Sequence, residues 1–216
     1  MEPINFIQLK TPLIVFAVLS SVFIIIQIFI VASANSTSSQ KYEVLESLGG
    51  IELRYYPTVT LATITSSAKT YRQLGNSGFS KLAKYIFGGN DGNKQIAMMT
   101  PVHMQINDQN ASMSFVMPSQ YSDVNFPQPY DSSVLIQTMA GEHVAAIQFA
   151  GFASEKMILF YTKKLQQALQ KSSVSYYGNF RFLGYNPPYQ LVNRRNEIII
   201  SINWDDRKPG FRIKHR

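Results

Sequence analysis

The 216-residue sequence contains no cysteine, and this absence excludes several kinds of chemistry. Disulfide bonds, thiolate metal sites, iron–sulfur clusters and cysteine nucleophiles all require that residue. Histidine is scarce as well: only His103, His143 and His215 occur, and they do not have the local spacing of metal ligands. The sequence also lacks His-Glu-x-x-His, a Walker A loop and Gly-x-Ser-x-Gly. We therefore predict a protein that is not an enzyme, with no catalytic residues and no metal site.

Acidic residues are also few: 13 Asp and Glu accompany 20 Lys and Arg, which gives a net charge of +7. Much of the excess lies in the last ten residues, which hold five Lys and Arg and no acid. Residues 204–216 are therefore expected to form a basic tail, either solvated or in contact with anionic lipid headgroups or a partner. Nucleic acid is not an expected ligand, because Phe211 is the one aromatic residue among those ten and offers no stacking platform.

One long apolar run is present at residues 13–32, with no charge and only three polar side chains. A helix needs about 20 apolar residues to cross a bilayer, and a buried helix of a soluble protein would alternate with polar positions. The run is followed by Ala32-Ser33-Ala34, a small-residue pattern that signal peptidase recognises. Residues 1–34 are therefore predicted to be a signal anchor that stays in the membrane or a signal peptide cleaved after Ala34. The length of the run favours the anchor.

The charges that flank this run give its orientation. Lys10 precedes it, whereas Glu43 and Glu46 follow Lys41 on the other side. This small bias places the N-terminus in the cytoplasm and the rest of the chain in a lumen or outside the cell. We predict a single-pass membrane protein with a lumenal or extracellular domain, or a secreted domain if the segment is cleaved.

Residues 35–40 are rich in Ser, Thr and Asn and are predicted to link this segment to a domain at 41–203. A helix is expected between about 68 and 87, firm from Ser77 onward, because two glycines weaken its first half. A second helix is expected at 155–169. Strands are expected at 42–48, 51–56, 59–65, 95–106, 112–117, 134–139, 144–149, 182–185 and 197–203.

The pattern of the domain repeats with an offset of 86 residues. This offset aligns 101–105 with 187–191, 61–65 with 147–151, and 112–117 with 198–203. Each half is expected to consist of strand, helix, strand and strand, and one half alone could not bury its apolar faces well. We predict an α+β fold: a pseudo-twofold duplicated unit that forms an antiparallel, curved or barrel-like sheet with two helices.

Three segments carry ordered motifs. The first joins Lys81-Leu82-Ala83-Lys84-Tyr85-Ile86-Phe87-Gly88, a Gly/Asn turn, and Ile96-Ala97-Met98-Met99-Thr100-Pro101-Val102. The second is Ser114-Phe115-Val116-Met117-Pro118-Ser119-Gln120-Tyr121. The third is Gly184-Tyr185-Asn186-Pro187-Pro188 with Arg194-Arg195-Asn196-Glu197-Ile198. In this order and at this spacing, the chain resembles the SOUL / heme-binding protein family over residues 41–203.

The resemblance implies the same architecture and the binding of heme or another tetrapyrrole as a ligand, not as a catalytic cofactor. It also places ligand contacts on the helix that matches 77–87 and on the loop beside it. An apolar surface would hold the ring, and a cation would pair with a carboxylate. The expected tetrapyrrole-binding residues are Phe79, Leu82, Ala83, Lys84, Met98 and Met99.

Two departures from the family pattern concern polar ligand contacts. One branch of the family has an arginine where Asn76 stands, and another has a ligand histidine where Tyr55 stands. Tyr55 and His103 are the candidate axial ligands of this sequence, although tetrapyrrole binding of modest affinity does not require one. We therefore expect loose binding without a strong axial histidine.

The leading hypothesis is reversible, non-catalytic binding of heme or another tetrapyrrole, for carriage, buffering or scavenging. The alternative is a protein-interaction module that uses the same scaffold without physiological heme. An enzyme that acts on tetrapyrroles is the third hypothesis. No motif in the sequence identifies a protein partner.

Overall fold

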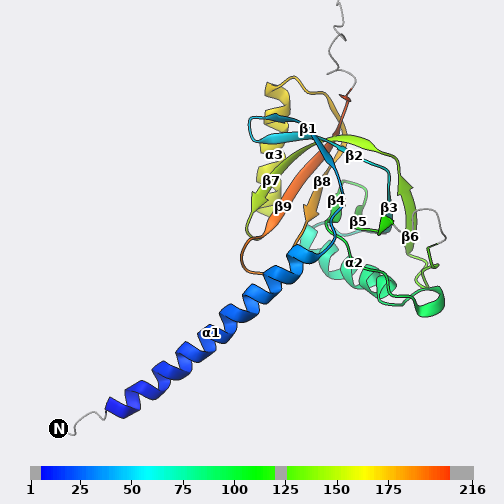
Figure 1. The fold of residues 1–216 in the computed structure, drawn as a ribbon. Coiled ribbons are helices and arrows are strands. Elements are labelled where there is room, and N and C mark those ends of the chain that lie inside the picture. Colours follow the sequence, from blue (N-terminus) through cyan, green and yellow to red (C-terminus); the bar gives the residue numbers. More distant parts are fainter. Residues whose placement is uncertain (1–5, 120–125, 205–216) are drawn as a thin grey trace, which may run out of the picture.

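The computed structural model describes residues 6–119 and 126–204. One long helix, α1 (Phe6–Ser36), stands away from a domain that holds the other elements (Figure 1). The domain has two further helices, α2 (Tyr71–Ile86) and α3 (Glu155–Lys171), and a one-turn 3-10 helix at Asp91–Asn93. Its strands are β1 (Glu43–Leu48), β2 (Ile51–Tyr56), β3 (Val59–Ser66), β4 (Val102–Ile106), β5 (Ala111–Val116), β6 (Val134–Met139), β7 (Glu142–Ala150), β8 (Tyr176–Gly184) and β9 (Arg195–Ile202).

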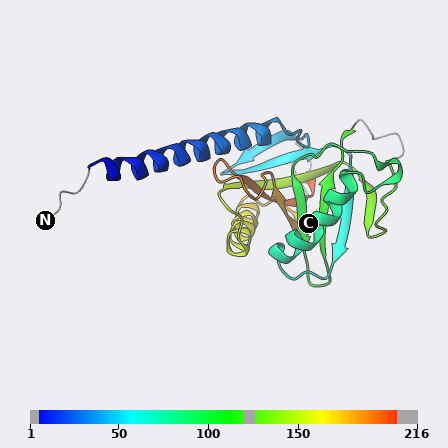
Figure 2. The ribbon, with the colours of Figure 1, turned by 90° about the horizontal axis from the view of Figure 1, so that it is seen from below.

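The strands form a single curved antiparallel sheet in the order β1-β2-β7-β9-β8-β4-β5-β3-β6. The pair of β4 and β8 joins the two halves of this sheet, and β1 and β6 are its edges. α2 packs against β3, β4 and β5, whereas α3 packs against β7, β8 and β9 (Figure 2). The predicted α+β class, with two helices on a curved antiparallel sheet, is confirmed.

The two faces of the sheet are buried in different ways. On the helix-covered face, one core cluster joins Leu82 of α2, Leu165 of α3 and Ile198 of β9. Side chains alternate between the faces along each strand, so neighbouring residues of β9 point the other way. There a smaller cluster forms, which includes Leu183 and Ile199. Buried polar side chains gather on this second face.

The proposed duplication stays a prediction. The element order β3-α2-β4-β5 recurs as β7-α3-β8-β9, and the offset of 86 residues places parts of β3 on β7 and of β5 on β9. However, the same offset aligns β4 with residues 188–192, which belong to no strand. In the element order the counterpart of β4 is β8, and in the sheet these two strands pair with each other.

α2 begins earlier than the expected firm helix at 77–87. Thr70 caps its first turn, because the Thr70 side chain accepts a hydrogen bond from the backbone N–H of Gln73 at 3.1 Å. A Cβ at Gly78 would lie 2.8 Å from Cδ1 of Ile64, so this glycine allows α2 to approach β3 closely. The helical region expected at about 68–87 is therefore confirmed as Tyr71–Ile86, and the cap and the close packing offset the low helix propensity of glycine.

The strand expected at 95–106 is also shorter than predicted. Only Val102–Ile106 forms β4, and it begins after Pro101. Proline has no N–H to donate to a strand ladder. Before it, Gln95 forms an isolated bridge with Phe87, and the N–H of Ile96 donates to the carbonyl of Ile86 at 2.8 Å. This segment therefore runs back beside the C-terminal end of α2.

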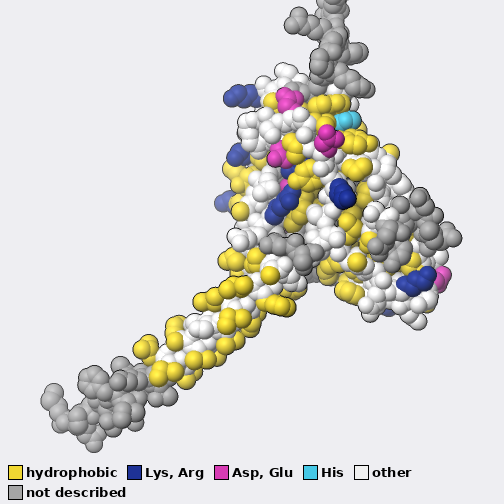
Figure 3. Space-filling model, in the orientation of Figure 1, with side chains coloured by type: hydrophobic (Ala, Val, Ile, Leu, Met, Phe, Trp, Pro, Cys, Tyr) yellow, Lys and Arg dark blue, Asp and Glu magenta, His cyan; other side chains and the backbone are white. Residues whose placement is uncertain are grey.

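α1 contains the apolar run that the sequence showed. In the described part of the chain, Pro12–Ser33 is the one helical stretch long and apolar enough to cross a membrane, and none of it is buried inside the protein (Figure 3). The link expected at 35–40 is short, because α1 continues to Ser36. The predicted basic tail lies outside the described residues, except for Trp204.

Candidate functional site

Apolar side chains on one side of α2 are partly open to solvent. Phe79, Ala83 and Phe87 follow one another at intervals of four residues, so they lie along one side of the helix. Phe79 is 40% exposed and Phe87 is 66% exposed, although the ring of Phe79 also packs edge-on against Phe115 at 5.2 Å. Lys84, next to Ala83, is exposed. We call Phe79, Ala83, Phe87 and Lys84 the α2 flank.

Residues 95–99, which include Met98 and Met99, run back from the end of this flank. They are held there by the bridge between Phe87 and Gln95 and by the bond from Ile96 to Ile86. Met98 and Met99 are half-buried, and Met98 packs against the main core. Apolar and polarizable side chains therefore lie beside an exposed helix, which is the kind of surface that a flat aromatic ligand can use.

The family-like motif at the end of α2 shapes this region. Gly88 has a φ of 105°, and the N–H of Gly89 donates to the carbonyl of Lys84 at 2.8 Å, so the helix ends with a glycine in the left-handed region. The buried side chain of Asn90 donates to the carbonyls of Tyr85 and Lys94 and accepts from the N–H of Lys94. These bonds fix the turn that directs the chain back along α2.

The positive charges of Lys81 and Lys84 lie near the carboxylate of Asp131. Lys81 donates to the hydroxyl of Ser133 at 3.1 Å. Hydrogen bonds from Ser133, and then the charges of Lys81 and Lys84, hold the pKa of Asp131 below its usual range. Lys84 itself is exposed and can pair with an added carboxylate.

The structure separates the predicted site residues into three groups. Phe79, Ala83, Lys84, Met98 and Met99 belong to α2 and the segment that returns along it. A second group consists of Leu82 alone, which is completely buried and packs in the main core.

The two candidate axial ligands form the third group, because they lie elsewhere. Tyr55 is on β2, which is separated from β4, the nearest strand under α2, by β7, β9 and β8. Its ring packs against His143 at 5.0 Å, and His143 stacks on Trp204. His103 is on β4, but its side chain is buried and its Nε2 lies 2.8 Å from Oε1 of Gln40. Within residues 6–119 and 126–204, no group of three His, Asp or Glu side chains could hold a metal ion.

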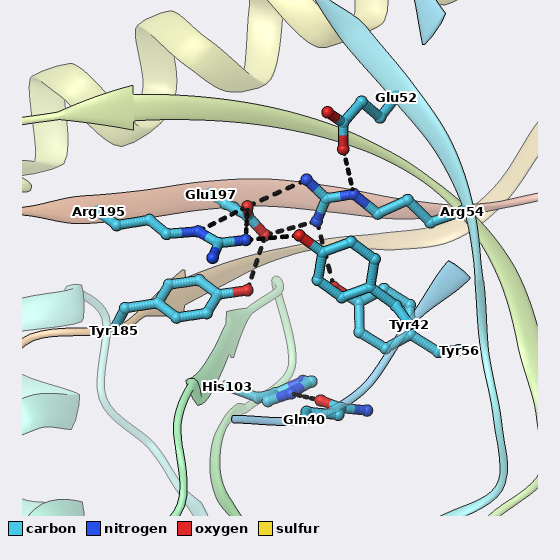
Figure 4. A network of polar contacts seen from close by, with 9 residues as sticks. All are labelled: Gln40, Tyr42, Glu52, Arg54, Tyr56, His103, Tyr185, Arg195 and Glu197. Atoms are coloured by element: carbon cyan, nitrogen blue, oxygen red, sulfur yellow. Dashed lines mark hydrogen bonds and ion pairs between the residues drawn. The ribbon is translucent and has the colours of Figure 1, made fainter. Parts of the chain in front are cut away.

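A buried ionic network on the second face of the sheet was not predicted from the sequence (Figure 4). Glu197 on β9 is fully buried and accepts two hydrogen bonds from Arg54 on β2, at 2.8 and 3.1 Å. Arg195 donates to the same carboxylate at 2.7 Å, and the hydroxyl of Tyr185 donates to it at 2.9 Å. Arg54 also donates to Glu52 at 2.8 Å. We call these five side chains the Arg54–Glu197 network.

The charges of this network are matched. Burial alone would raise the pKa of Glu197, but Arg54 and Arg195 outweigh burial and hold that pKa below its usual range. Burial and the nearby Glu197 charge raise the pKa of Tyr185. The carboxylate is therefore charged and already bonded to three side chains, which suits a structural role better than proton transfer.

Strand pairing explains why this network forms. β2 and β9 both pair with β7, so Arg54 and Glu197 lie on the same face one strand apart. The only local signal of this network in the sequence was Arg54, a charged residue inside a strand with apolar side chains. Its partner is 143 residues away, and the alternation of side chains predicts a face but not a partner.

A second polar contact fastens the segment after α1 to the domain. The N–H of Gln40 donates to the carbonyl of Thr100 at 2.7 Å, and the N–H of Thr100 donates to the carbonyl of Ser38 at 2.9 Å. The side chain of Gln40 also bonds to His103 (Figure 4). The domain is therefore held close to the end of α1 rather than hanging from a free linker.

His103 is expected to make the stability of the fold sensitive to acid. Burial, with a smaller effect of Arg181, lowers its pKa from 6.5 to about 3. Below pH 6.5 the unfolded chain therefore binds a proton that the folded chain does not. The contribution of His103 to folding is complete above that pH, and stability falls by about 1.4 kcal/mol per pH unit as the pH drops toward the lower value.

The measurement is urea unfolding of the wild type and of His103→Gln at several pH values between about 7 and 5. The loss of stability per pH unit should be smaller in the variant than in the wild type. The difference should be about 1.4 kcal/mol per pH unit, which corresponds to one proton. Equal slopes in the two proteins would show that His103 does not carry this dependence.

Comparisons with known proteins bear on the whole folded domain. The model of the family "SOUL heme-binding protein" matches residues 37–201. Heme-binding protein 1 of Mus musculus is 26% identical over 176 residues, which are 76% of this chain and 92% of the relative. Heme-binding protein 2 of Homo sapiens is 26% identical over 158 residues, 69% of this chain and 77% of the relative. Among solved structures, the EcmrR C-terminal domain shares the fold, with a TM-score of 0.56, 8% identity, and coverage of 71% of this chain and 96% of that domain.

Proposed function

The chain belongs to the SOUL heme-binding protein family, and on that premise we propose that it binds heme or another tetrapyrrole reversibly, without catalysing a reaction. The observation that carries the proposal is the extent of the family match. It begins at residue 37, where α1 ends, and finishes at residue 201 in the last strand. The matched part is thus a complete domain with its own core, and not a shared motif in an unrelated fold.

The α2 flank supports a site for a tetrapyrrole ring. Phe79 and Phe87 offer apolar surface to solvent, and Lys84 can pair with a carboxylate at the edge of the ring. Met98 and Met99 return along the same helix and could adapt to the ring, because thioether side chains are flexible and polarizable. Large exposed apolar side chains next to a cation are typical of a binding surface rather than of a solvated helix face.

The donor groups of the structure fit a ring held by its faces and carboxylates better than an iron held by histidine. His103 is buried and bonded to Gln40, and His143 lies between Tyr55 and Trp204. Neither histidine is on α2 or on the segment beside it. A bound heme would supply its own iron chemistry, and the residues of this chain would bind and orient it through Phe79 and Lys84.

We further propose that α1 tethers the domain to a membrane, with the domain in a lumen or outside the cell. Pro12–Ser33 exposes apolar side chains over its whole length, and the described part of the domain buries none of this stretch. Exposed apolar surface of that size is stable in a bilayer but not in water. If the segment is cleaved after Ala34, the same domain is secreted.

The experiment that tests the proposal is a titration of the full-length protein in detergent micelles with hemin, followed through its Soret absorbance. Saturable binding with a stoichiometry of one supports the proposal. A Soret spectrum that does not saturate would overturn it and favour the alternative of a protein-interaction module on the same scaffold.

A further inference from the structure

The loop between β8 and β9 carries an unusual set of exposed side chains. Tyr189, Leu191 and Val192 are 62%, 45% and 53% exposed, and they lie within four consecutive residues. Three large apolar groups at the tip of one loop are unfavourable in water unless something covers them.

Four backbone carbonyls of this loop are bonded to side chains of the same segment. The side chain of Gln190 is completely buried and donates to the carbonyls of Val192 and Asn193 at 2.8 and 3.3 Å. One guanidinium nitrogen of Arg194 donates to the carbonyls of Pro187 and Gln190, both at 2.7 Å. Polar backbone groups that are bonded internally can leave water at low cost, which is the condition for entering a lipid layer. Loop 187–193 meets this condition at four of its carbonyls.

Three of the backbone nitrogens in this loop also leave no unpaired N–H. Pro187 and Pro188 have no N–H that would need a partner. The N–H of Leu191 donates to Oε1 of Gln27, in the middle of α1, at 3.2 Å. A polar side chain within the apolar run of α1 is thereby paired with the loop.

The loop lies along the apolar part of α1, not beyond its end. Leu191 and Val192 form a groove with Phe23, Ile28 and Val31 of the helix. Gln27 precedes Ser33, the end of the apolar stretch, by six residues, which is about 9 Å along a helix. In Figure 1 the loop reaches back along α1 from the domain, and Figure 3 shows apolar side chains continuing from α1 onto this edge of the domain.

We propose that loop 187–193 inserts into the interfacial layer of the bilayer that α1 crosses, and so docks the domain against the membrane. This inference rests on the tether in the proposed function. The occupant of the apolar surface is lipid, because the surface is continuous with a helix whose own partner is lipid. An insertion of about 9 Å is the depth that interfacial apolar segments reach. The domain then has two attachments, the span itself and the loop, which limit its rotation about α1.

The absence of cysteine makes a direct test simple, since any single Cys variant can be labelled at one position. The test variants are Leu191→Cys and Val192→Cys, each labelled with the environment-sensitive fluorophore NBD. Ile25→Cys reports on the span, and Leu159→Cys, an exposed apolar position on α3, is the control away from α1. The full-length variants are reconstituted in phosphatidylcholine vesicles, with or without phosphatidylcholine that carries a nitroxide near the top of its acyl chain.

The expected result is blue-shifted emission and nitroxide quenching at Leu191 and Val192, with neither at Leu159. If Ile25 is quenched but the loop labels behave like the Leu159 label, the inference fails while the tether stands. If the loop labels are blue-shifted but not quenched, they pack on α1 instead of lipid, which also overturns the inference. An unquenched label at Ile25 would remove the tether itself and the docking with it. Binding of hemin, measured on the same variants, reports separately on the ligand proposal.

Discussion

Replacing Glu197 by Gln is expected to lower the free energy of unfolding by about 3–5 kcal/mol, because it removes the one fully buried carboxylate that pairs with the buried arginine. Arg54 is almost completely buried and is paired with Glu197 through two hydrogen bonds. The introduced amide would keep the shape of the side chain and could still accept from Tyr185, so the loss would report charge rather than volume. The measurement is urea unfolding of the full-length protein in micelles at neutral pH.

Glu52→Gln is the matched control. This carboxylate pairs with the same arginine at 2.8 Å, but its side chain is 40% exposed. Water and salt screen such a pair, so its loss should change stability by less than about 1 kcal/mol. If both variants lost the same stability, burial would not be what makes the Arg54–Glu197 pair important.

Negative charge introduced on the α2 flank is expected to weaken hemin binding at least about tenfold, equivalent to about 1.4 kcal/mol. Phe79→Asp places a charge where the ring would lie, and Lys84→Glu replaces the cation next to a carboxylate by an anion. Because Phe79 also packs on Phe115, Phe87→Asp serves as a second apolar variant at a more exposed position. The dissociation constant comes from Soret titration of each folded variant.

Matched substitutions on α3 provide the controls. Leu159→Asp and Lys163→Glu make the same chemical changes at exposed positions on the other helix. These two variants should bind hemin as the wild type does. Equal weakening on both helices would indicate a general charge effect, and no weakening on α2 would place the ligand elsewhere.

Local patterns were sufficient to predict most of the fold. The strands expected at 42–48 and 51–56 are confirmed as β1 and β2, and Gly49 and Gly50, both with positive φ, form the tight turn between them. The expected helix contains Leu82 and Ile86 four residues apart, and both are almost completely buried on one side of α2. These features depend on neighbours within about four residues, which a sequence displays directly.

Features that depend on distant residues were not predictable in the same way. The first half of α2 was expected to be weak, because the sequence shows Gly78 as a weak helix former and does not show how close Ile64 lies. The Arg54–Glu197 pair joins two strands that meet only through β7. For the ligand site, Phe79 and Lys84 were expected from the family resemblance alone, and their role stays a prediction. Leu82 was expected on the same ground, although it faces the core.

The most direct measurement of the central claim is a paired titration of the full-length protein with hemin and with protoporphyrin IX, which lacks iron. We propose that Phe79 and Lys84 hold the tetrapyrrole and that no histidine does, so both ligands are expected to saturate at one equivalent with dissociation constants within about threefold, or about 0.7 kcal/mol. Saturation by hemin alone would contradict this account and require an iron ligand, with Tyr55, His103 and Met98 as the side chains to replace first. Saturation by neither would contradict tetrapyrrole binding altogether, while the fold and the family would stand.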